Sequence, residues 1–523
     1  MSANGRKEWL KNTVFYEIYP TSFFDSDDDG VGDIRGIIQK LDYVKSLGCN
    51  GIWLNPIFLS EFRDGGYDVV DYYKVDPRFG DGADLERLFA EAHKRGIKIL
   101  LDLVMGHTSD KCRWFTESSK SGRNEYSDYY IWSDSVWDNP EGCRMINGMS
   151  ERDGNYMVNF FAMQPALNFG FVNPTVPWQK PYTDPFFEKM RGLVIDVIEF
   201  WLGKGADGFR VDMAGVMIKN DTTGEANARL WKQILDKVHA RYPNAVFVSE
   251  WSRPETAVGK GGYDMDFLIH VHGEGYISLL RAEREVRPFG HDYYESYFRR
   301  GGGTPESFFK EFLTAHAGLN GKGFIAIPTG NHDLSRISVG RTDEEIITAF
   351  AFLFTLPSVP FVYYGDEIGM RFINGLNKDG GYNRTGSRTP MQWDGSANNG
   401  FSNAPADKLY LPTDVGSEYT VERQERGGSI LNYTRELIAL RKTEPALAAD
   451  IPITLVGEYS DNPFVYTRSD GQTRITVAVN PKGGGVSAAA DGGCEVLSAL
   501  NASYEGGRIR FSGAGYIILR SRV

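Results

Sequence analysis

Ionisable side chains follow several short apolar runs of this chain, and their types suit nucleophilic and acid–base chemistry. In the run Gly208-Phe209-Arg210-Val211-Asp212, Arg210 and Asp212 lie two residues apart, so on a strand they project to the same side. An arginine beside a carboxyl favours the ionised form, and a positioned carboxylate can act as a covalent nucleophile. On its own, however, an Arg-x-Asp pair at a strand end is more often a structural ion pair.

Three further apolar runs end in comparable side chains. Asp102 and His107 follow one run, Glu250 follows another, and a third leads into Asn331-His332-Asp333. If these run ends meet, several carboxyls, two histidines and Arg210 converge. Such a group suits glycoside cleavage, with one carboxylate as nucleophile or base and one carboxylic acid as proton donor, or else a divalent cation. Aromatic residues make up 13% of the chain, which favours sugar as the ligand.

The elements that would position these side chains alternate between apolar strands and amphipathic helices. Strands are predicted at 13–18, 51–54, 97–104, 208–212, 245–249, 265–269, 324–328 and 359–363. Helices are predicted at 34–47, 85–93, 186–202, 226–241, 305–317, 343–356 and 429–441, with at most a short one at 254–258. Nearly unbroken apolar strands that alternate with helices indicate a buried parallel sheet.

A closed (β/α)8 TIM barrel, which is an α/β fold, accommodates these elements. A doubly wound open sheet also fits the alternation, but the chain lacks the Gly-rich phosphate turn of that fold. In a barrel the carboxyl ends of the strands form one mouth, which would gather all the side chains described above. We therefore predict a barrel with an active site at this mouth.

Two segments depart from the barrel pattern. We expect barrel domain A at 1–104 and 178–446, an inserted domain B after the third strand at 105–177, and a C-terminal antiparallel β-sandwich, domain C, at 447–523. In the last segment, 464–467, 474–479 and 515–519 have strand character, and Asp470-Gly471 suits a hairpin turn.

The overall composition narrows the possible partners and the compartment. The formal net charge of −12 over 523 residues argues against nucleic acid and anionic membranes. No apolar run is long enough for a membrane span, and the N-terminus has no apolar signal-peptide region. The four cysteines are scattered without metal-binding spacing. We expect a reduced, cytoplasmic protein, and its oligomeric state stays open.

Several of these stretches resemble the motifs of a known enzyme family, the α-amylase superfamily. Its four main motifs are matched in order by 102–107, 208–212, 248–251 and 330–333, and its domain-B motif by 164–168. The stretch 388–394 is similar to a signature of the branch that contains oligo-1,6-glucosidases, α-glucosidases and trehalose synthases. The resemblance covers essentially the whole chain.

The resemblance implies a role for each matching residue. Asp212 would be the nucleophile, Glu250 the general acid/base and Asp333 the transition-state stabiliser. His107, Arg210 and His332 would hold a glucose unit in subsite −1, with Tyr67 stacked beneath it. The expected function is a retaining α-glucoside hydrolase that acts on α-linked gluco-oligosaccharides without an organic cofactor.

Some positions depart from the family pattern. Gly106 stands where amylases have an asparagine that binds calcium between the barrel and domain B, so we expect that calcium site to be absent. Gly215-Val216 replaces the Lys-His pair that contacts leaving-group sugars in amylases, which argues against an endo-acting starch amylase. Met213 matches neither the 1,6-type nor the 1,4-type residue of the branch, so the linkage stays open.

Asp64 and Arg384 match a pair that closes subsite −1 in exo-acting glucosidases; the alternative is a surface ion pair between two loops. The segment 369–384 is shorter than in oligo-1,6-glucosidases, which could admit longer or cyclic glucans. We expect an exo-acting α-glucosidase. The alternatives are cleavage of cyclic or longer maltosaccharides, or a transglycosylase or isomerase such as trehalose synthase. A non-enzyme role like that of transporter heavy chains is disfavoured, because this chain keeps the whole catalytic trio.

The loop 25–33 carries oxygen-bearing residues at alternating positions, like the start of an EF-hand loop. Its candidate metal ligands are Asp25, Asp27, Asp29, Val31 and Asp33. The twelfth loop position is Gly36 in place of the EF-hand glutamate, and a solvated acidic turn is the alternative. Because similar loops of this branch bind metal, we expect a structural Ca²⁺, or Mg²⁺ in its place.

Overall fold

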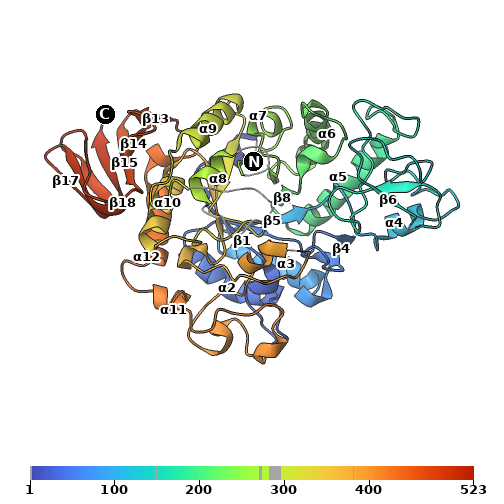
Figure 1. Ribbon diagram of the computed structural model, residues 1–523, viewed down its shortest axis with the longest axis horizontal. Coiled ribbons are helices and arrows are strands. Elements are labelled where there is room, and N and C mark those ends of the chain that lie inside the picture. Colours follow the sequence, from blue (N-terminus) through green and yellow to red (C-terminus); the bar gives the residue numbers. More distant parts are fainter. Residues whose placement is uncertain (1–2, 149, 270–273, 282–295, 381) are drawn as a thin grey trace.

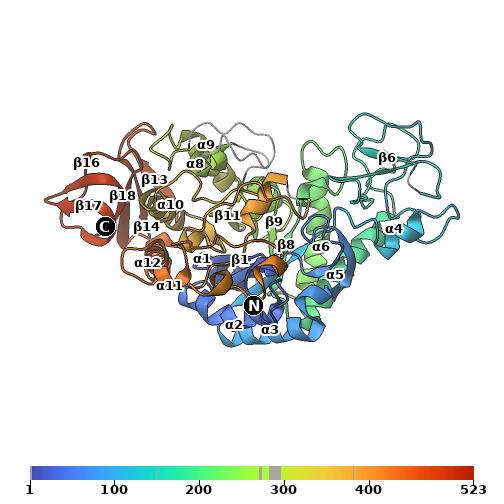
Figure 2. The same cartoon turned by 60° about the horizontal axis from the view of Figure 1, so that its bottom comes forward.

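The computed structural model describes residues 3–148, 150–269, 274–281, 296–380 and 382–523. A barrel occupies the middle of the molecule (Figures 1 and 2). The segment that follows the third barrel strand lies at one end of the long axis, and the C-terminal strands lie at the other. No helix within the described ranges is long and apolar enough to cross a membrane.

The barrel consists of parallel strands that close on themselves. They are β1 (Phe15–Ile18), β2 (Gly51–Leu54), β5 (Lys98–Leu103), β8 (Gly208–Val211), β9 (Val246–Ser249), β10 (Met265–Phe267), β11 (Phe324–Pro328) and β12 (Val359–Tyr363). Each strand pairs with the next barrel strand in the chain, and β12 pairs with β1. The predicted TIM barrel and all of its predicted strands are confirmed, because unbroken apolar runs fit strands that are buried on both faces.

Helices cover the outside of the barrel. They are α2 (Ile34–Ser46), α3 (Gly82–Lys94), α5 (Phe187–Lys204), α6 (Glu225–Arg241), α7 (Pro254–Ala257), α8 (Gly275–Leu280), α9 (Glu306–Gly318), α10 (Asp343–Thr355) and α12 (Ile430–Thr443). Capping side chains fix several N-termini: Asp33 accepts from Gly36 N at 2.7 Å before α2, and Thr342 forms a capping box with Glu345 before α10. The predicted helices are confirmed, including the short α7, whereas α8 and the N-terminal α1 (Ala3–Lys11) were not predicted.

Aromatic side chains fill the barrel interior. Phe15 of β1 stacks on Phe361 of β12, with ring centroids 4.4 Å apart and an interplanar angle of 8°. Phe267 packs between Phe361 and Trp53 at 4.8 and 5.4 Å. Glu17 of β1 is the register partner of Trp53 on β2 and of Tyr363 on β12. Its buried carboxyl therefore lies at the same level of the barrel as these aromatic residues.

The inserted segment between β5 and α5 contains little regular structure. Its elements are the helix α4 (Arg113–Ser118) and the hairpin of β6 (Met145–Asn147) with β7 (Asn155–Met157). Isolated bridges, among them His107 to Ala166, connect it to the loop after β5. A second hairpin, β3 (Phe58–Ser60) with β4 (Val69–Val75), follows β2 and carries the loop with Asp64 and Tyr67. These two excursions frame the mouth of the barrel.

The C-terminal strands form an antiparallel sheet. They are β13 (Ile453–Val456), β14 (Phe464–Ser469), β15 (Thr473–Asn480), β16 (Ser487–Ala489), β17 (Glu495–Glu505) and β18 (Arg508–Arg522). The predicted strands lie within β14, β15 and β18, and Asp470-Gly471 makes the predicted turn between β14 and β15. Arg468 donates to the carbonyl oxygens of Thr355 at 2.9 Å and Leu447 at 3.1 Å, which ties the sheet to the end of α10.

Candidate active site

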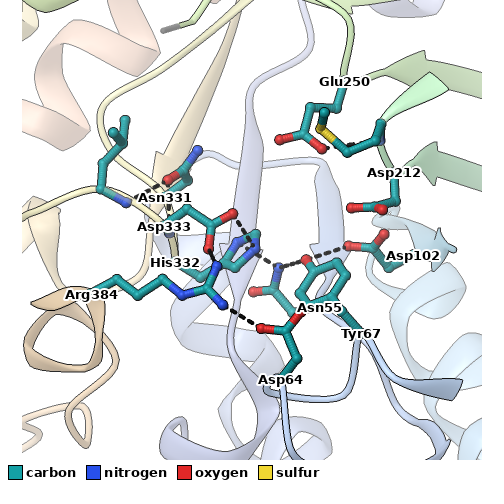
Figure 3. A network of polar contacts seen from close by, with 12 residues as sticks. Asn55, Asp64, Tyr67, Asp102, Asp212, Glu250, Asn331, His332, Asp333 and Arg384 are labelled. Carbon is teal, nitrogen blue, oxygen red and sulfur yellow. Dashed lines mark hydrogen bonds and ion pairs between the residues drawn. The ribbon is translucent and has the colours of Figure 1, made fainter. Parts of the chain in front are cut away.

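The predicted catalytic carboxyls meet at the mouth of the barrel, where each follows a different strand. Asp212 follows β8, Glu250 follows β9, and Asp333 lies in the loop after β11. Figure 3 shows Asp212 and Glu250 on one side of the site and Asp333 on the other. Asp212 and Glu250 are buried, and Asp333 is partly exposed. The barrel therefore brings together residues that are more than 120 positions apart in the chain, from 212 to 333.

Three carboxyls surround the guanidinium of Arg210. Its Nη1 lies 2.8 Å from Asp102 Oδ1 and 2.9 Å from Asp212 Oδ1, and its Nη2 lies 2.6 Å from Glu250 Oε2. The backbone N–H of Met213 also donates to Glu250 Oε2, at 3.1 Å. The other oxygens, Asp212 Oδ2 and Glu250 Oε1, receive no hydrogen bond from any described residue. Each carboxyl thus keeps one oxygen available for a substrate.

This side of the site carries more carboxyls than its single arginine can neutralise. Burial raises the pKa of Asp212 well above its ordinary value, and Glu250 and Asp102 raise it further, while Arg210 opposes the shift. Burial also raises the pKa of Asp102. Because the carboxyls are neighbours, their titrations are coupled, and the group as a whole retains a proton at a higher pH than isolated carboxyls would.

Asp333 has the opposite surroundings. Its Oδ1 accepts from Arg384 Nη1 at 2.6 Å and from Arg388 Nη2 at 3.1 Å, and its Oδ2 lies 3.2 Å from His332 Nε2. Burial alone would raise the pKa of Asp333, but His332 and the two arginines hold it well below the ordinary value. Asp333 is therefore a stable anion.

His332 and Tyr67 form a stacked pair in the floor of the site. Their rings are 5.1 Å apart with an interplanar angle of 10°. Tyr67 Oη donates to Asp102 Oδ2 at 2.9 Å, which connects this floor to the Arg210 group. Although burial acts to lower the pKa of His332, Asp333 and Glu17 raise it to about 9. One face of the Tyr67 ring therefore lies against His332.

His107 is buried beside this floor, and its Nε2 lies 3.0 Å from the carbonyl oxygen of Tyr67. Burial lowers the pKa of His107 to about 4, so its imidazole is neutral near pH 7. No described residue hydrogen-bonds its Nδ1. The edge of the Phe160 ring packs against it at 5.7 Å, and Phe160 is 39% exposed. Phe160 was not among the predicted site residues.

Asp64 and Arg384 form the predicted ion pair between Asp64 Oδ1 and Arg384 Nη2. Gln164 Nε2 of the inserted segment donates to Asp64 Oδ2 at 2.7 Å. Arg384 also contacts Asp333, so the same guanidinium joins the wall of the site to a predicted catalytic carboxylate. Both side chains of the pair are largely buried, which excludes the alternative of a surface pair.

The backbone after Asp212 is tightly constrained. Met213 has a left-handed conformation with φ 39°, which directs its N–H towards Glu250. At Gly215 a Cβ atom would lie 2.3 Å from Nε1 of Trp251. The indole therefore requires glycine at this position, which explains why no Lys-His pair can stand here.

The junction beside Gly106 contains a buried ammonium group. Asn159 Nδ2 donates to the Gly106 carbonyl at 2.8 Å, and Asn159 Oδ1 accepts from Lys219 Nζ at 2.8 Å. Lys219 Nζ also donates to the carbonyl of Val216 at 2.6 Å. Burial lowers the pKa of Lys219 to about 7. A lysine thus joins the inserted segment to the loop after β8.

The acidic loop 25–33 lies outside the catalytic group. One ligand atom from each of Asp25, Asp27 and Asp29 lies within 4.8 Å of the others, which fits a hard cation. Asp33 lies outside this group, and its oxygens accept from Ser26 N at 2.6 Å and from Gly36 N at 2.7 Å. Val31 donates its N–H to Asp29 Oδ1 at 2.8 Å.

Several residues of the site were missed from the sequence. They are Asn55, which lies between Tyr67 and His332, together with Glu17, Gln164 and Arg388. Gln164 and Arg388 fall within stretches that resemble family motifs, so their position was a usable signal. Glu17 is a lone acid in an apolar strand, and nothing in its local pattern marks it.

The comparisons with known proteins agree with this fold. Residues 17–260 and 294–450 match the family described as Alpha amylase, catalytic domain. A trehalose synthase/amylase of Mycolicibacterium smegmatis is 32% identical over 483 residues, covering 84% of this chain and 77% of that protein. An oligo-1,6-glucosidase of Heyndrickxia coagulans is 32% identical over 541 residues, covering 90% and 92%.

Solved structures of similar proteins superpose over nearly the whole chain. The trehalulose synthase of Pseudomonas mesoacidophila gives a TM-score of 0.81 at 25% identity and covers 98% of this chain and 99% of its own. A trehalose-6-phosphate hydrolase of Bacillus licheniformis gives 0.80 at 25% identity with the same coverage of 98% and 99%. A parallel barrel with paired carboxyls at its mouth suits a glycoside hydrolase. This chain belongs to the alpha-amylase family.

Proposed function

We propose that the protein is a retaining, exo-acting α-glucosidase that cleaves α-linked gluco-oligosaccharides. The observation that supports this most strongly is the arrangement of Asp212, Glu250 and Asp333 around one site whose outer wall is the Asp64–Arg384 pair. The names of relatives such as the oligo-1,6-glucosidases favour the same class of substrate.

In the first step Asp212 is the nucleophile and Glu250 the acid. Asp212 Oδ2, which accepts no hydrogen bond from the described residues, attacks the anomeric carbon of the glucose unit. Glu250, as the acid, gives a proton from Oε1 to the glycosidic oxygen as the C–O bond breaks. The products are a glucosyl ester on Asp212 and the released sugar, which now carries a free hydroxyl group.

In the second step water replaces the released sugar. Glu250, now ionised, removes a proton from the water, whose oxygen attacks the anomeric carbon and releases Asp212. Two inversions give glucose with its original anomeric configuration. Asp333 remains an anion throughout and binds sugar hydroxyls, because its low pKa prevents it from taking up the proton.

The Asp64–Arg384 pair makes the site a pocket for one terminal glucose. Both side chains are largely buried and are tied to Gln164 on one side and Asp333 on the other. A pocket that is closed at this end admits chain ends only, so glucose should be released one unit at a time.

A second candidate is isomerisation or transglycosylation with the same catalytic residues. The similarity to a trehalose synthase/amylase and to a trehalulose synthase favours it. The two reactions share the first step and differ in the acceptor, which is water in one and a retained sugar in the other. Cleavage of cyclic or longer maltosaccharides is the further alternative if the wall opens.

Product analysis distinguishes these functions. Digests of maltose, maltotriose, isomaltose, sucrose, trehalose and a cyclodextrin should be followed by chromatography from the first minutes. Glucose as the first product from maltotriose or isomaltose supports the proposal. Conversion of maltose to trehalose with little free glucose supports the isomerase, and early maltose from the cyclodextrin contradicts the closed pocket.

We propose that Ca²⁺, or Mg²⁺ in its place, binds Asp25, Asp27 and Asp29 and stabilises the fold. The mutual proximity of the three carboxyls supports this, and burial together with neighbouring aspartates raises the pKa of Asp27. The ion would offset the repulsion between these aspartates. It would also stabilise the contact of the loop with Ser402, whose hydroxyl donates to Asp25 at 2.6 Å. The loop lies away from the catalytic carboxyls, so the ion would have no part in the reaction.

Metal removal tests this proposal. A chelator should lower the Tm and added Ca²⁺ should restore it, because a ligand that binds only the folded state stabilises that state. Asp27→Asn should abolish the response, whereas Asp28→Asn, in the same loop but outside the carboxyl group, should preserve it. An unchanged melting curve together with metal analysis that shows no bound ion would contradict the site.

We also propose that the protein works in a reducing compartment such as the cytoplasm. The four cysteines are free thiols, and Cys49 and Cys112 are buried. Thiol titration of the protein purified from its native host would check this: four reactive groups after unfolding are expected, and a disulfide would contradict it.

A further inference from the structure

A buried carboxyl of the barrel interior contacts the site from below. Glu17 of β1 is fully buried, and its Oε1 lies 2.9 Å from His332 Nδ1. Asn55 Nδ2 donates to the same oxygen at 3.2 Å. No hydrogen-bond partner reaches Glu17 Oε2 from the described residues. Glu17 has no contact with the position of the sugar in the proposed mechanism, so any influence on the reaction passes through His332 or, by way of Asn55, through Tyr67.

Both ring nitrogens of His332 face carboxylates. Nδ1 lies against Glu17, and Nε2 lies 3.2 Å from Asp333 Oδ2. A neutral imidazole carries one N–H, so one of its nitrogens would present a lone pair to a carboxylate. With both carboxyls ionised, only the doubly protonated ring places a hydrogen opposite each of them. The Nε2 contact is an ion pair without an aligned hydrogen bond, so this hydrogen can also be donated to a ligand.

The other charged groups near His332 leave this arrangement intact. Arg388 donates its Nε–H to the His332 backbone carbonyl at 2.8 Å, and with Arg384 it is bound to Asp333. Arg210 is paired with other carboxyls of the site. One of them, Asp102, accepts a hydrogen bond from Tyr67, which lies beneath the imidazole. Tyr67 itself stacks on the ring as a neutral group. Glu17 is therefore the negative charge that reaches the Nδ1 side.

We propose that Glu17 is a positioning residue that keeps His332 as an imidazolium and so directs its Nε2–H towards Asp333 and the substrate. The inference rests on the proposed function, because only a bound sugar gives that hydrogen an acceptor besides Asp333. Burial alone would lower the pKa of His332, and the two carboxylates raise it to about 9. Without Glu17 one of these two carboxylates is missing.

Replacing Glu17 by glutamine removes the negative charge but keeps a side chain that can hydrogen-bond His332 Nδ1. A glutamine amide can donate to the lone pair of Nδ1, so the neutral ring with its proton on Nε2 would be satisfied. Removal of an adjacent charge shifts a pKa by roughly 1–3 units. His332 should then lose its proton near neutral pH, where the enzyme works.

The titration of His332 gives a readout that does not depend on activity. The chain has 8 histidines, so NMR of isotope-labelled histidine resolves them, and His332→Gln identifies the signal of interest. In the unmodified enzyme His332 should remain protonated at pH 8. In Glu17→Gln its pKa should fall by about two units, which leaves His332 mostly neutral at pH 8. Glu367→Gln is the matched control, because Glu367 is equally buried but accepts from Tyr16 and Tyr43 and contacts no residue of the site.

The pH dependence of kcat/KM on a short α-glucoside gives the second readout. The ratio of Glu17→Gln to the unmodified enzyme should be within about threefold of unity at pH 5.5 and should fall to about one tenth or less at pH 8. A purely structural loss would reduce activity equally at both values. Glu17→Asp, which keeps the charge, should restore much of the loss at pH 8.

Each other outcome overturns part of the proposal. A neutral His332 at pH 7 in the unmodified enzyme refutes it even if Glu17→Gln does not fold. An unchanged His332 pKa in Glu17→Gln refutes the pairing, and a ratio that is constant with pH refutes the positioning role. If the enzyme cleaves no α-glucoside while the pKa falls as expected, the proposed function fails and the pairing of Glu17 with His332 stands.

Discussion

The two sides of the site hold the same kind of residue in opposite electrostatic surroundings. On one side Asp212, Glu250 and Asp102 share the single guanidinium of Arg210. On the other side Asp333 contacts three cations, His332, Arg384 and Arg388, of which His332 also pairs with Glu17 and Arg384 with Asp64. One side therefore places three carboxyls on one cation, whereas the other places three cations on one carboxyl, Asp333.

This difference decides where a proton can reside. The pKa of Asp212 is raised by burial and by its acidic neighbours, whereas His332 and the arginines hold the pKa of Asp333 well below the ordinary value. Acid catalysis needs a carboxyl that keeps its proton near neutrality, and only the first side can supply one. Asp333 is then left with the role of a permanent anion.

The largest effect is expected from Asp212→Asn. The covalent intermediate cannot form without the carboxylate, so turnover should fall by at least about a thousandfold while the fold is retained. Initial rates and thermal unfolding should be measured on the same preparation. Residual activity of more than a few per cent, in a sample free of contaminating glucosidase, would refute the assignment of the nucleophile.

Arg384→Ala should have an intermediate effect, because it removes one cation from the Asp333 side and opens the wall at Asp64. Loss of a charged hydrogen bond costs about 1.5–3 kcal/mol, so kcat/KM on maltose should fall by roughly ten- to a hundredfold. Longer glucans should suffer less, since they could pass the opened wall.

Arg371→Ala is the matched control for this change. Arg371 lies on the same segment but contacts Asp343 and Tyr419 outside the site. Its replacement should leave kcat/KM within about twofold, as expected of a surface substitution. If both variants lose activity equally on short and long substrates, the closed pocket is wrong.

The smallest expected effect is on the Tm, and it is specific to the difference between the two sides of the site. Two isosteric substitutions, one on each side, should change the Tm in opposite directions. Asp212→Asn removes an acid whose ionisation is opposed by its neighbours and should raise the Tm at pH 7 by a few degrees. Asp333→Asn leaves Arg384, Arg388 and His332 without their shared anion and should lower it by a similar amount.

The pH dependence of these shifts follows from the direction of each pKa change. The folded-state pKa of Asp333 is depressed, so its ionised form stabilises the fold above the ordinary carboxyl pKa near 4, and this contribution is lost as pH falls through the folded value. The folded-state pKa of Asp212 is raised, so its ionisation lowers the stability of the fold as pH rises above the ordinary carboxyl pKa. Melting curves from pH 4 to 7 should therefore diverge, and shifts of the same sign at pH 7 would contradict the comparison.

Much of the architecture could be predicted from the sequence, because barrel strands buried on both faces leave unbroken apolar runs. The catalytic carboxyls stand directly after such runs, so their convergence followed from the barrel. Glu17 could not be found in this way, since its function depends on His332, which lies 315 positions away. Phe160 was missed because it lies in the inserted segment, where periodicity gives no signal.

The acidic loop and the pocket wall show a second limit. Alternating acids predicted a ligand set with Asp33 in it, but Asp33 also follows the pattern of a helix N-cap, and its hydrogen bonds serve that role. Arg384 was predicted to pair with Asp64, yet its second contact with Asp333 depends on how two loops approach each other in space. Local spacing does not contain that information.

Trapping of the covalent intermediate tests the central claim most directly. The enzyme should be incubated with a fluorinated α-glucosyl fluoride, in which the fluorine substituent slows release of the ester, then digested at low pH and analysed by mass spectrometry. We predict one added fluoroglucosyl group on the peptide that contains Asp212, and none in the Asp212→Asn variant. An adduct on Glu250 or Asp333, or turnover without any adduct, would contradict the assignment of the two sides of the site.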